Sequence, residues 1–138
     1  MNSEASARQP VIDRPLALET LAALRRLATD AATAAGLDDE RTGLFAVAVD
    51  EAMTNAIRYA GGGNLSITVV EGASVAVEVR DAGPGIPPGT STQLPPPDAV
   101  SGRGLWLMRS LCDDLDIDTG PAGTTVRLAM TVSQRQSG

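Results

Sequence analysis

The sequence predicts an α+β fold, a two-layer sandwich in which helices cover one face of a mostly antiparallel sheet. Apolar residues first recur at helical spacing, and two later runs alternate at period two. A further helical segment then precedes two more short strands. With 138 residues and 43% hydrophobic content, we expect one domain over residues 1–138, with its core at about 16–130 and frayed termini.

Two helices are expected first. Pro15 suits the first position of a helix, and a stripe of leucines follows it until Gly36 stops the helix. Asp38 can cap a second helix, which ends at the three glycines 61–63. The three glycines follow a helix and not a strand, so they indicate a helix stop and not a phosphate-binding loop.

Glu51 and Asn55 lie four residues apart in the second helix, so a carboxylate and a carboxamide point the same way. The apolar stripe that they continue consists of Leu44, Val47 and Ala48. Because this helix is apolar on most sides, we expect it to be buried and Glu51 to be withdrawn from bulk water. An unpaired buried carboxylate is costly. Either a ligand or metal offsets that cost, or the backbone or Arg58 satisfies the pair.

The following segments read as strands, a loop and a third helix. Residues 65–69 and 75–79 alternate as an antiparallel hairpin with one buried face. Proline, glycine, serine and threonine dominate residues 84–102, which predicts a long loop, and a third helix is expected from about 103 to 113. Two short strands follow near 115–118 and 124–130, joined through residues 120–123.

The composition excludes several kinds of site. All eleven basic residues are Arg, so a P-loop lysine, a Ser-His-Asp triad, a Schiff base and an internal phosphohistidine are impossible. Cys112 is alone, which excludes an internal disulfide, and we expect it to pack as a small hydrophobe. A net charge of −6 argues against nonspecific nucleic-acid binding. No apolar run approaches the roughly 20 residues that span a bilayer, so we expect a cytoplasmic protein.

Asp81 ends the second strand of the hairpin on the face of its buried valines, and Gly83 and Gly85 follow it. A carboxylate there can accept a hydrogen bond from an exocyclic amine, as on adenine, and glycines let the backbone approach a flat ligand. The alternative is a strand-ending Asp in a Gly/Pro turn. Thr124 opens the last strand with its hydroxyl inward, where it can complete a base-recognition network with Asp81, although buried threonines also occur without a ligand.

The segment Gly102, Arg103, Gly104 and Leu105 lies where the predicted loop enters the third helix. Free N–H groups at a helix N-terminus bind phosphate, and Arg103 can add positive charge. The alternative is ordinary loop punctuation ahead of a helix.

Taken in order, these motifs resemble the GHKL ATPase superfamily, which includes histidine-kinase catalytic domains, DNA gyrase and heat-shock chaperone ATPases. The order is a helix with Glu-x-x-x-Asn, a strand ending Asp-x-Gly-x-Gly, a loop ending Gly-x-Gly-Leu before a helix, and a strand opening Gly-Thr. The resemblance covers roughly Leu16 to Met130. At this size, and with residues 56–60 after the Asn, the chain looks most like the anti-sigma-factor serine/threonine kinases of bacteria.

The resemblance implies a role for each motif residue at the phosphoryl-transfer end. Asn55 would ligate Mg²⁺, and Glu51 would be the catalytic general base that deprotonates an attacking hydroxyl. Two departures bear on activity: Tyr59 stands where many relatives carry His, and no Lys is available near the γ-phosphate.

The resemblance also implies the residues that hold the rest of ATP. Asp81 would bind the adenine amine, Gly83 and Gly85 would shape the adenine pocket, and Thr124 would support it. The residues implied at the phosphates are Gly102, Arg103 and Gly104, followed by Leu105 in the third helix. The preceding loop would be the lid over ATP.

The function implied is that of an ATP-dependent and Mg²⁺-dependent serine/threonine protein kinase. It would sequester a sigma factor and phosphorylate an anti-anti-sigma partner of the STAS type, without direct contact to nucleic acid or membrane. A homodimer is left open. The alternative is a nucleotide-responsive regulatory binding protein of the same fold without significant kinase activity, and a histidine-kinase module acting in trans is a third option.

Overall fold

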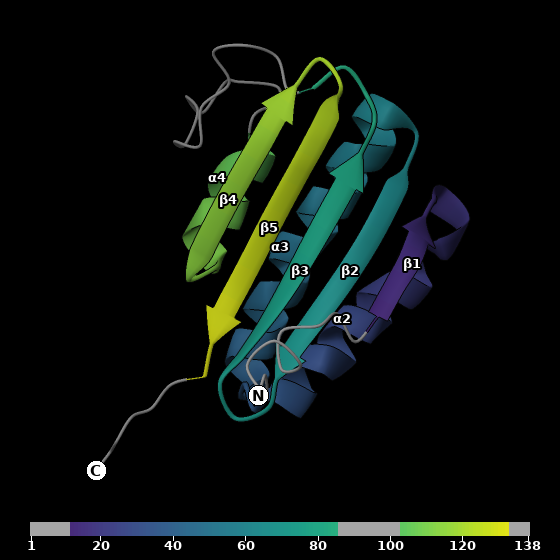
Figure 1. Cartoon of the computed structure of the whole chain (residues 1–138). Coiled ribbons are helices and arrows are strands. Elements are labelled where there is room, and N and C mark those ends of the chain that lie inside the picture. The colour runs from purple at the N-terminus through teal and green to yellow at the C-terminus, as the bar shows by residue number, and fades with distance from the viewer. Residues whose placement is uncertain (1–11, 86–102, 133–138) are drawn as a thin grey trace, which may run out of the picture.

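The computed structural model describes residues 12–85 and 103–132 as two layers, which confirms the predicted α+β sandwich. A five-stranded antiparallel sheet in the order β1-β2-β3-β5-β4 forms one layer, and helices cover one of its faces (Figure 1). In chain order, the elements are β1 (Ile12–Leu16), the 3₁₀ turn η1 (Leu18–Thr20), α2 (Leu21–Ala35), α3 (Asp39–Ala60), β2 (Gly63–Val70), β3 (Ser74–Asp81), α4 (Arg103–Leu111), β4 (Asp114–Gly120) and β5 (Gly123–Thr131).

The central helix α3 begins and ends where the sequence predicts. The side chain of Asp38 accepts a hydrogen bond from the backbone N–H of Arg41 at 2.8 Å, which satisfies one of the free donors of the first turn. At the other end, Gly61 adopts a φ of 78°, a left-handed conformation that glycine tolerates best, and its N–H donates to the carbonyl of Ile57.

The beginning of the first helix was predicted wrongly. Pro15 lies in the edge strand β1, opposite Asn64 of β2, and α2 begins only at Leu21 after the turn η1. An edge strand tolerates proline because one side of its backbone has no partner strand, so the missing N–H costs little. Leu18, counted in the predicted leucine stripe, is 70% exposed. The predicted stop at Gly36, with a φ of 112°, is confirmed.

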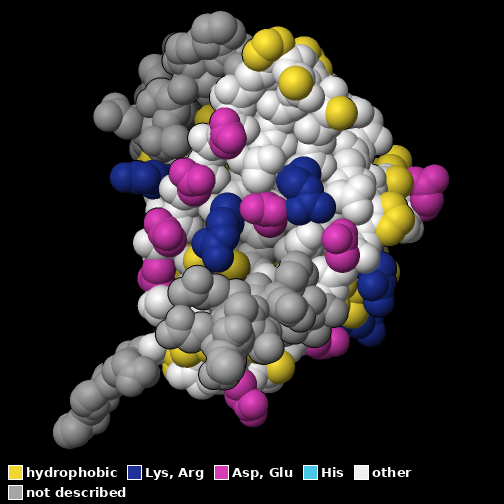
Figure 2. All heavy atoms as spheres, in the orientation of Figure 1, with side chains coloured by type: hydrophobic (Ala, Val, Ile, Leu, Met, Phe, Trp, Pro, Cys, Tyr) yellow, Lys and Arg dark blue, Asp and Glu magenta, His cyan; other side chains and the backbone are white. Residues whose placement is uncertain are grey.

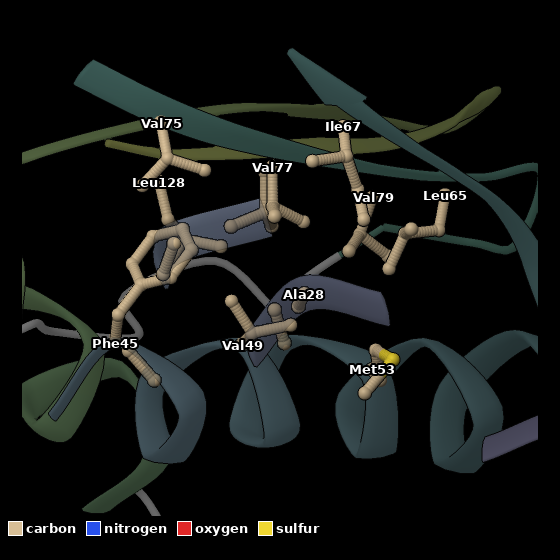
Figure 3. Close-up of a cluster of buried hydrophobic side chains, with 14 of the residues drawn as sticks. Ala28, Phe45, Val49, Met53, Leu65, Ile67, Val75, Val77, Val79 and Leu128 are labelled. Carbon is tan, nitrogen blue, oxygen red and sulfur yellow. The ribbon is translucent and has the colours of Figure 1, made fainter. Parts of the chain in front are cut away.

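The core lies between α3 and the sheet. Phe45, Val49 and Met53 of α3 point toward the valines of β3, as Figure 3 shows. All the labelled side chains of this cluster are at most 2% exposed: Ala28, Phe45, Val49, Met53, Leu65, Ile67, Val75, Val77, Val79 and Leu128. Full burial of each large side chain is worth about 1.5–3 kcal/mol, so this cluster fixes α3 against the sheet.

The buried face of α3 differs from the predicted stripe. Leu44 and Val47 are 37% and 46% exposed, and the positions that contact the core are Phe45, Ala48, Val49, Ala52, Met53 and Ala56. Those six positions follow the spacing of one helix face. Glu51 therefore lies beside the buried face and is half-buried, so the predicted withdrawal of its carboxylate from water is only partial.

The other strands follow the predicted alternation. The β2–β3 hairpin pairs Leu65 with Val79 and Ile67 with Val77, and β4 and β5 form a second hairpin. The third helix, α4, ends at Leu111, slightly before the predicted position 113. The predicted long loop lies outside the described residues from position 86 onward, as do residues 1–11 and 133–138 of the predicted frayed ends. No helix in the described ranges has the length and apolar character needed to cross a membrane.

The face of the sheet turned away from the helices is polar, with basic and acidic side chains interspersed (Figure 2). Arg80 of β3 lies 2.7 Å from Glu78 on its own strand and 3.9 Å from Asp13 of β1. It also donates to the hydroxyl of Ser66 on β2. These pairs join the three strands at their solvent side.

A second polar cluster joins the beginning of α3, the α4–β4 junction and the end of β5. Arg41 donates to the carboxylate of Asp113 at 2.5 Å and to the carbonyl of Thr131 at 3.0 Å. Asp113 also accepts from the N–H and the hydroxyl of Thr131, at 2.8 and 3.0 Å. Burial raises the pKa of Asp113, but the Thr131 hydrogen bonds and the Arg41 charge outweigh it and hold this pKa below its ordinary value.

Candidate functional site

A pocket lies between the second half of α3 and the adjoining ends of β3 and β5. It contains five of the residues predicted to bind ATP, namely Asn55, Asp81, Gly85, Leu105 and Thr124. Its other walls are formed by Ala52, Ala56, Tyr59, Val79 and Val126. Residues that are distant in the sequence thus meet at one site that combines polar and apolar side chains.

Two of the polar residues that line the pocket, Asp81 and Thr124, belong to a row of three side chains on neighbouring strands. Asp81 of β3 lies opposite Thr124 of β5, and Thr124 lies opposite Thr119 of β4. Thr124 is 7% exposed, and its hydroxyl is 2.8 Å from the hydroxyl of Thr119. The predicted inward orientation of Thr124 is confirmed, because Val126, Leu128 and Met130 are also buried at alternate positions of β5.

Sequence reasoning missed Thr119. The signal that could have found it is the alternation of Leu115, Ile117 and Thr119, which continues the inward face of β4. The alternation alone does not place Thr119 near the other polar residues; the β4–β5 register puts it beside Thr124.

Asp81 makes the hydrogen bond expected of a strand-ending turn and also lines the pocket. One carboxylate oxygen, Oδ1, accepts the backbone N–H of Gly83 at 2.9 Å, as in a strand-ending turn. Asp81 lines the pocket, and within the described residues no hydrogen bond reaches its other oxygen, which can accept one from a ligand. The turn thus orients the carboxylate and leaves acceptor capacity unused.

The two glycines after Asp81 allow close contacts within the protein. A Cβ on Gly83 would lie 2.6 Å from the Cβ of Ala60, so only glycine lets this segment approach the end of α3. Gly85 has a φ of +90°, and a Cβ there would lie 2.5 Å from the carbonyl oxygen of Gly120. Gly85 also lines the pocket, whereas Gly83, which was predicted to shape it, is not among the lining residues and packs against the end of α3.

Asn55 and Glu51 lie one turn apart on α3, and both are half-buried. Asn55 lines the pocket, and Glu51 lies one turn toward the N-terminal end of the helix. In the described part of the chain, no ion pair joins Glu51 to Arg58, whose guanidinium lies 5.9 Å from the ring of Tyr59. The alternative in which Arg58 neutralises Glu51 is therefore not observed.

The residues fit Mg²⁺ only as an ion shared with a ligand. Across residues 12–85 and 103–132, no group of three or more His, Cys, Asp or Glu side chains could hold a metal by itself. Asn55 lines the pocket, and its side-chain amide makes no hydrogen bond within those ranges. One such oxygen together with phosphates and water is a usual Mg²⁺ environment.

The predicted phosphate end is described only in part. Gly102 lies outside the described residues, and of Arg103 and Gly104 only the backbone at the start of α4 is described. Leu105, one residue further, is 6% exposed and lines the pocket, so the beginning of α4 adjoins it.

The lone thiol of Cys112 packs partly against the core, as predicted for a small hydrophobe. Burial, with a smaller contribution from the neighbouring Asp113 carboxylate, raises the pKa of Cys112 to about 12. It therefore stays protonated at neutral pH, which disfavours nucleophilic chemistry.

A comparison with models of protein families identifies the family of this chain. The family model of the histidine kinase-like ATPase domain matches residues 15–130. The chain belongs to this family. The resemblance drawn from its motifs is thereby confirmed.

Solved structures of the same fold agree with this membership. The RsbU and RsbW domains of Rv1364c from Mycobacterium tuberculosis superpose with a TM-score of 0.62 at 17% identity, over 88% of this chain and 32% of that one. The histidine kinase domain of the Erythrobacter litoralis EL346 blue-light activated histidine kinase gives 0.55 at 24% identity, over 93% and 69%. A second structure of that kinase gives 0.55 at 25%, over 83% and 42%.

The chain thus spans about a third of the first of these structures. Among proteins of curated function, none matches the chain significantly.

Proposed function

We propose that this histidine kinase-like ATPase domain binds ATP with Mg²⁺ and acts as an anti-sigma-factor serine/threonine kinase. One observation carries the proposal: Asn55, Asp81 and Thr124, from three different elements, line one pocket between α3 and the sheet. The half-buried Glu51 lies one helical turn from Asn55. A metal ligand, a base-recognition pair and a candidate general base are thus close to one another.

Adenine is the ring that the polar row fits. Its C6 amine is a donor that matches the unused oxygen of Asp81, and its N1 is an acceptor that matches a hydroxyl proton of Thr124. Val79, Val126 and Leu105 supply apolar walls for the ring faces. Guanine presents the opposite pattern, an acceptor at C6 and a donor at N1, and would meet the Asp81 carboxylate with a carbonyl.

Transfer would occur at the α3 end of the site. Asn55 would hold Mg²⁺, which neutralises phosphate charge and so makes the γ-phosphoryl group easier to transfer. Glu51 would orient a serine or threonine hydroxyl of a partner and accept its proton as the oxygen attacks the γ-phosphorus, while the bond from that phosphorus to the bridging oxygen breaks and ADP leaves. Because Glu51 is half-buried and not enclosed, a side chain from another protein can reach it.

In the family that the motifs resemble, the acceptor is a Ser or Thr of a partner, so the absence of His from this chain is consistent with transfer to another protein. The motif resemblance points to an anti-anti-sigma protein of the STAS type as acceptor and to a sigma factor as the sequestered partner. The RsbW domain in the M. tuberculosis structure supports the same direction. These partners would act with the protein in the cytoplasm.

A second function is favoured by one observation. No basic side chain is among the described residues that line the pocket, and Glu51 is not among them either. A protein whose site binds ATP but stabilises the transferring phosphate poorly would bind its partner in response to nucleotide without phosphorylating it.

The test combines nucleotide binding with labelled transfer to a co-purified partner. Asn55→Ala should weaken Mg²⁺-dependent ATP binding about tenfold or more, while Asn64→Ala, the same substitution on an exposed strand position, should not. Glu51→Gln should keep ATP binding and lower transfer by roughly 10²–10⁴-fold. Glu71→Gln in the exposed β2–β3 turn is its control.

The possible outcomes distinguish a kinase from a nucleotide-responsive binding protein. Label on a partner Ser or Thr that is lost in Glu51→Gln supports the kinase. ATP-dependent partner binding without label supports the binding protein. Unchanged ATP binding and turnover in Asn55→Ala would exclude the Mg²⁺ assignment.

A further inference from the structure

We infer that Thr119 is a positioning residue for adenine, which holds the hydroxyl of Thr124 so that its proton is available to the base. This inference rests on the proposed ATP-binding function and adds a residue that the motif resemblance does not include. It starts from the row Asp81, Thr124 and Thr119 on β3, β5 and β4.

The row is fixed by the sheet register. Thr124 lies between its two partners on the central strand of the three, so its side chain has Asp81 on one side and Thr119 on the other. Its hydroxyl is 2.8 Å from that of Thr119, the length of a good O–H···O hydrogen bond. Thr124 is 7% exposed, whereas Thr119 is exposed at the outer strand β4.

The hydrogen bond between the two threonines can leave the proton of Thr124 available to a ligand. A hydroxyl has one proton and two lone pairs, so only one of the two threonines donates in their mutual bond. When Thr119 donates, Thr124 uses a lone pair and keeps its own proton for another acceptor. Beside an Asp81 oxygen that accepts the C6 amine, that acceptor is N1 of adenine, the next atom along the edge of the ring.

Without the Thr119 hydroxyl, Thr124 loses this orientation. Its proton can then turn to the nearby Asp81 carboxylate, which would engage both groups with each other and not with the base. The hydroxyl of Thr119 thus acts through Thr124 and does not touch the nucleotide.

The test must separate this role from a structural one, since a cross-strand threonine pair also stabilises a sheet. The probes are ATP and 1-deaza-ATP, in which a C–H replaces N1 and nothing else changes at that edge. Thr119→Val removes the hydroxyl but keeps the shape and the strand preference of the residue. Thr119→Ser restores the hydroxyl, and Thr125→Val is the same substitution one position away from Thr124 on β5.

The wild-type protein should bind ATP about fivefold more tightly than 1-deaza-ATP, the effect of one hydrogen bond. Thr119→Val should weaken ATP binding about fivefold and leave 1-deaza-ATP nearly unchanged, so that the preference disappears. Thr119→Ser should keep most of the preference, and Thr125→Val should keep all of it. Thermal unfolding of each variant, followed by far-UV circular dichroism, shows that it is folded.

A Thr119→Val variant that weakens both nucleotides equally, or neither, overturns the inference. So does a wild-type protein that binds ATP and 1-deaza-ATP with the same affinity, although ATP binding itself then stands. A wild-type protein that binds neither nucleotide overturns the proposed function, and the inference with it.

Discussion

Gly83 lies so close to α3 that a larger residue at this position should destabilise the fold. Gly83→Ala introduces a Cβ 2.6 Å from the Cβ of Ala60 and 3.2 Å from the carbonyl oxygen of Tyr59. Ordinary van der Waals contact begins at 3.4 Å, so the segment after β3 or the last turn of α3 has to move by several tenths of an ångström. The backbone of Gly83 is not in the left-handed region, so the strain comes from this contact.

Two effects of opposite sign set the magnitude. Overpacking costs about 1–3 kcal/mol, while replacing glycine by alanine restricts the unfolded chain and contributes roughly 0.4–1 kcal/mol in favour of folding. The net expectation is a loss of about 1–2 kcal/mol in the free energy of unfolding. For a domain of this size, that corresponds to a Tm lower by about 3–8 °C.

Thermal unfolding followed by far-UV circular dichroism measures this change, and Gly43→Ala is the matched control. Gly43 lies on the exposed side of α3, and no atom lies within 4 Å of a Cβ built there. Alanine is the better helix former by roughly 0.5–1 kcal/mol, so the Tm of this variant should rise. A Gly83→Ala protein that melts at or above the wild-type temperature would refute the reasoning.

Two further predictions follow from the second polar cluster and from the thiol beside it. Asp113→Asn should lower the free energy of unfolding at pH 7, because the lowered pKa of Asp113 means that its ionised form stabilises the fold. That contribution is present above the ordinary pKa of Asp and is lost as the pH falls through the lowered value. The difference between wild type and variant in urea unfolding should therefore shrink below a pH of about 4, and a constant difference would contradict it. Cys112, with a pKa of about 12, should react with iodoacetamide at pH 8 about tenfold or more slowly in the folded protein than in urea; equal rates would contradict its burial.

Local signals in the sequence predicted the elements that depend on local chemistry. The Asp38 cap and the glycine stop at Gly61 fixed α3, since both act within one helical turn. Alternation fixed the inward faces of β3 and β5, and with them the positions of Asp81 and Thr124. The inward orientation of these side chains was predictable because it depends only on the alternation within each strand.

Features that depend on tertiary contacts were not predictable. The strand β1 has five residues and contains Pro15, and it exists because β2 offers it an edge. The buried face of α3 could not be chosen from the sequence because the helix is apolar on most sides. The packing against α2, α4 and the sheet decides it, and this leaves Leu44 and Val47 exposed. The position of Thr119 beside Thr124 depends on the register between β4 and β5, which the sequence does not specify.

The order of the strands also determines when the site can form. β5 is the last strand along the described chain, yet it lies inside the sheet, between β3 and β4. The pair Asp81 and Thr124 therefore cannot assemble until nearly all of the domain has emerged and β5 has paired with a strand far back in the sequence. Completion of this pocket is thus a late event in the folding of this domain, and a chain interrupted before β5 lacks the wall that Thr124 and Val126 supply.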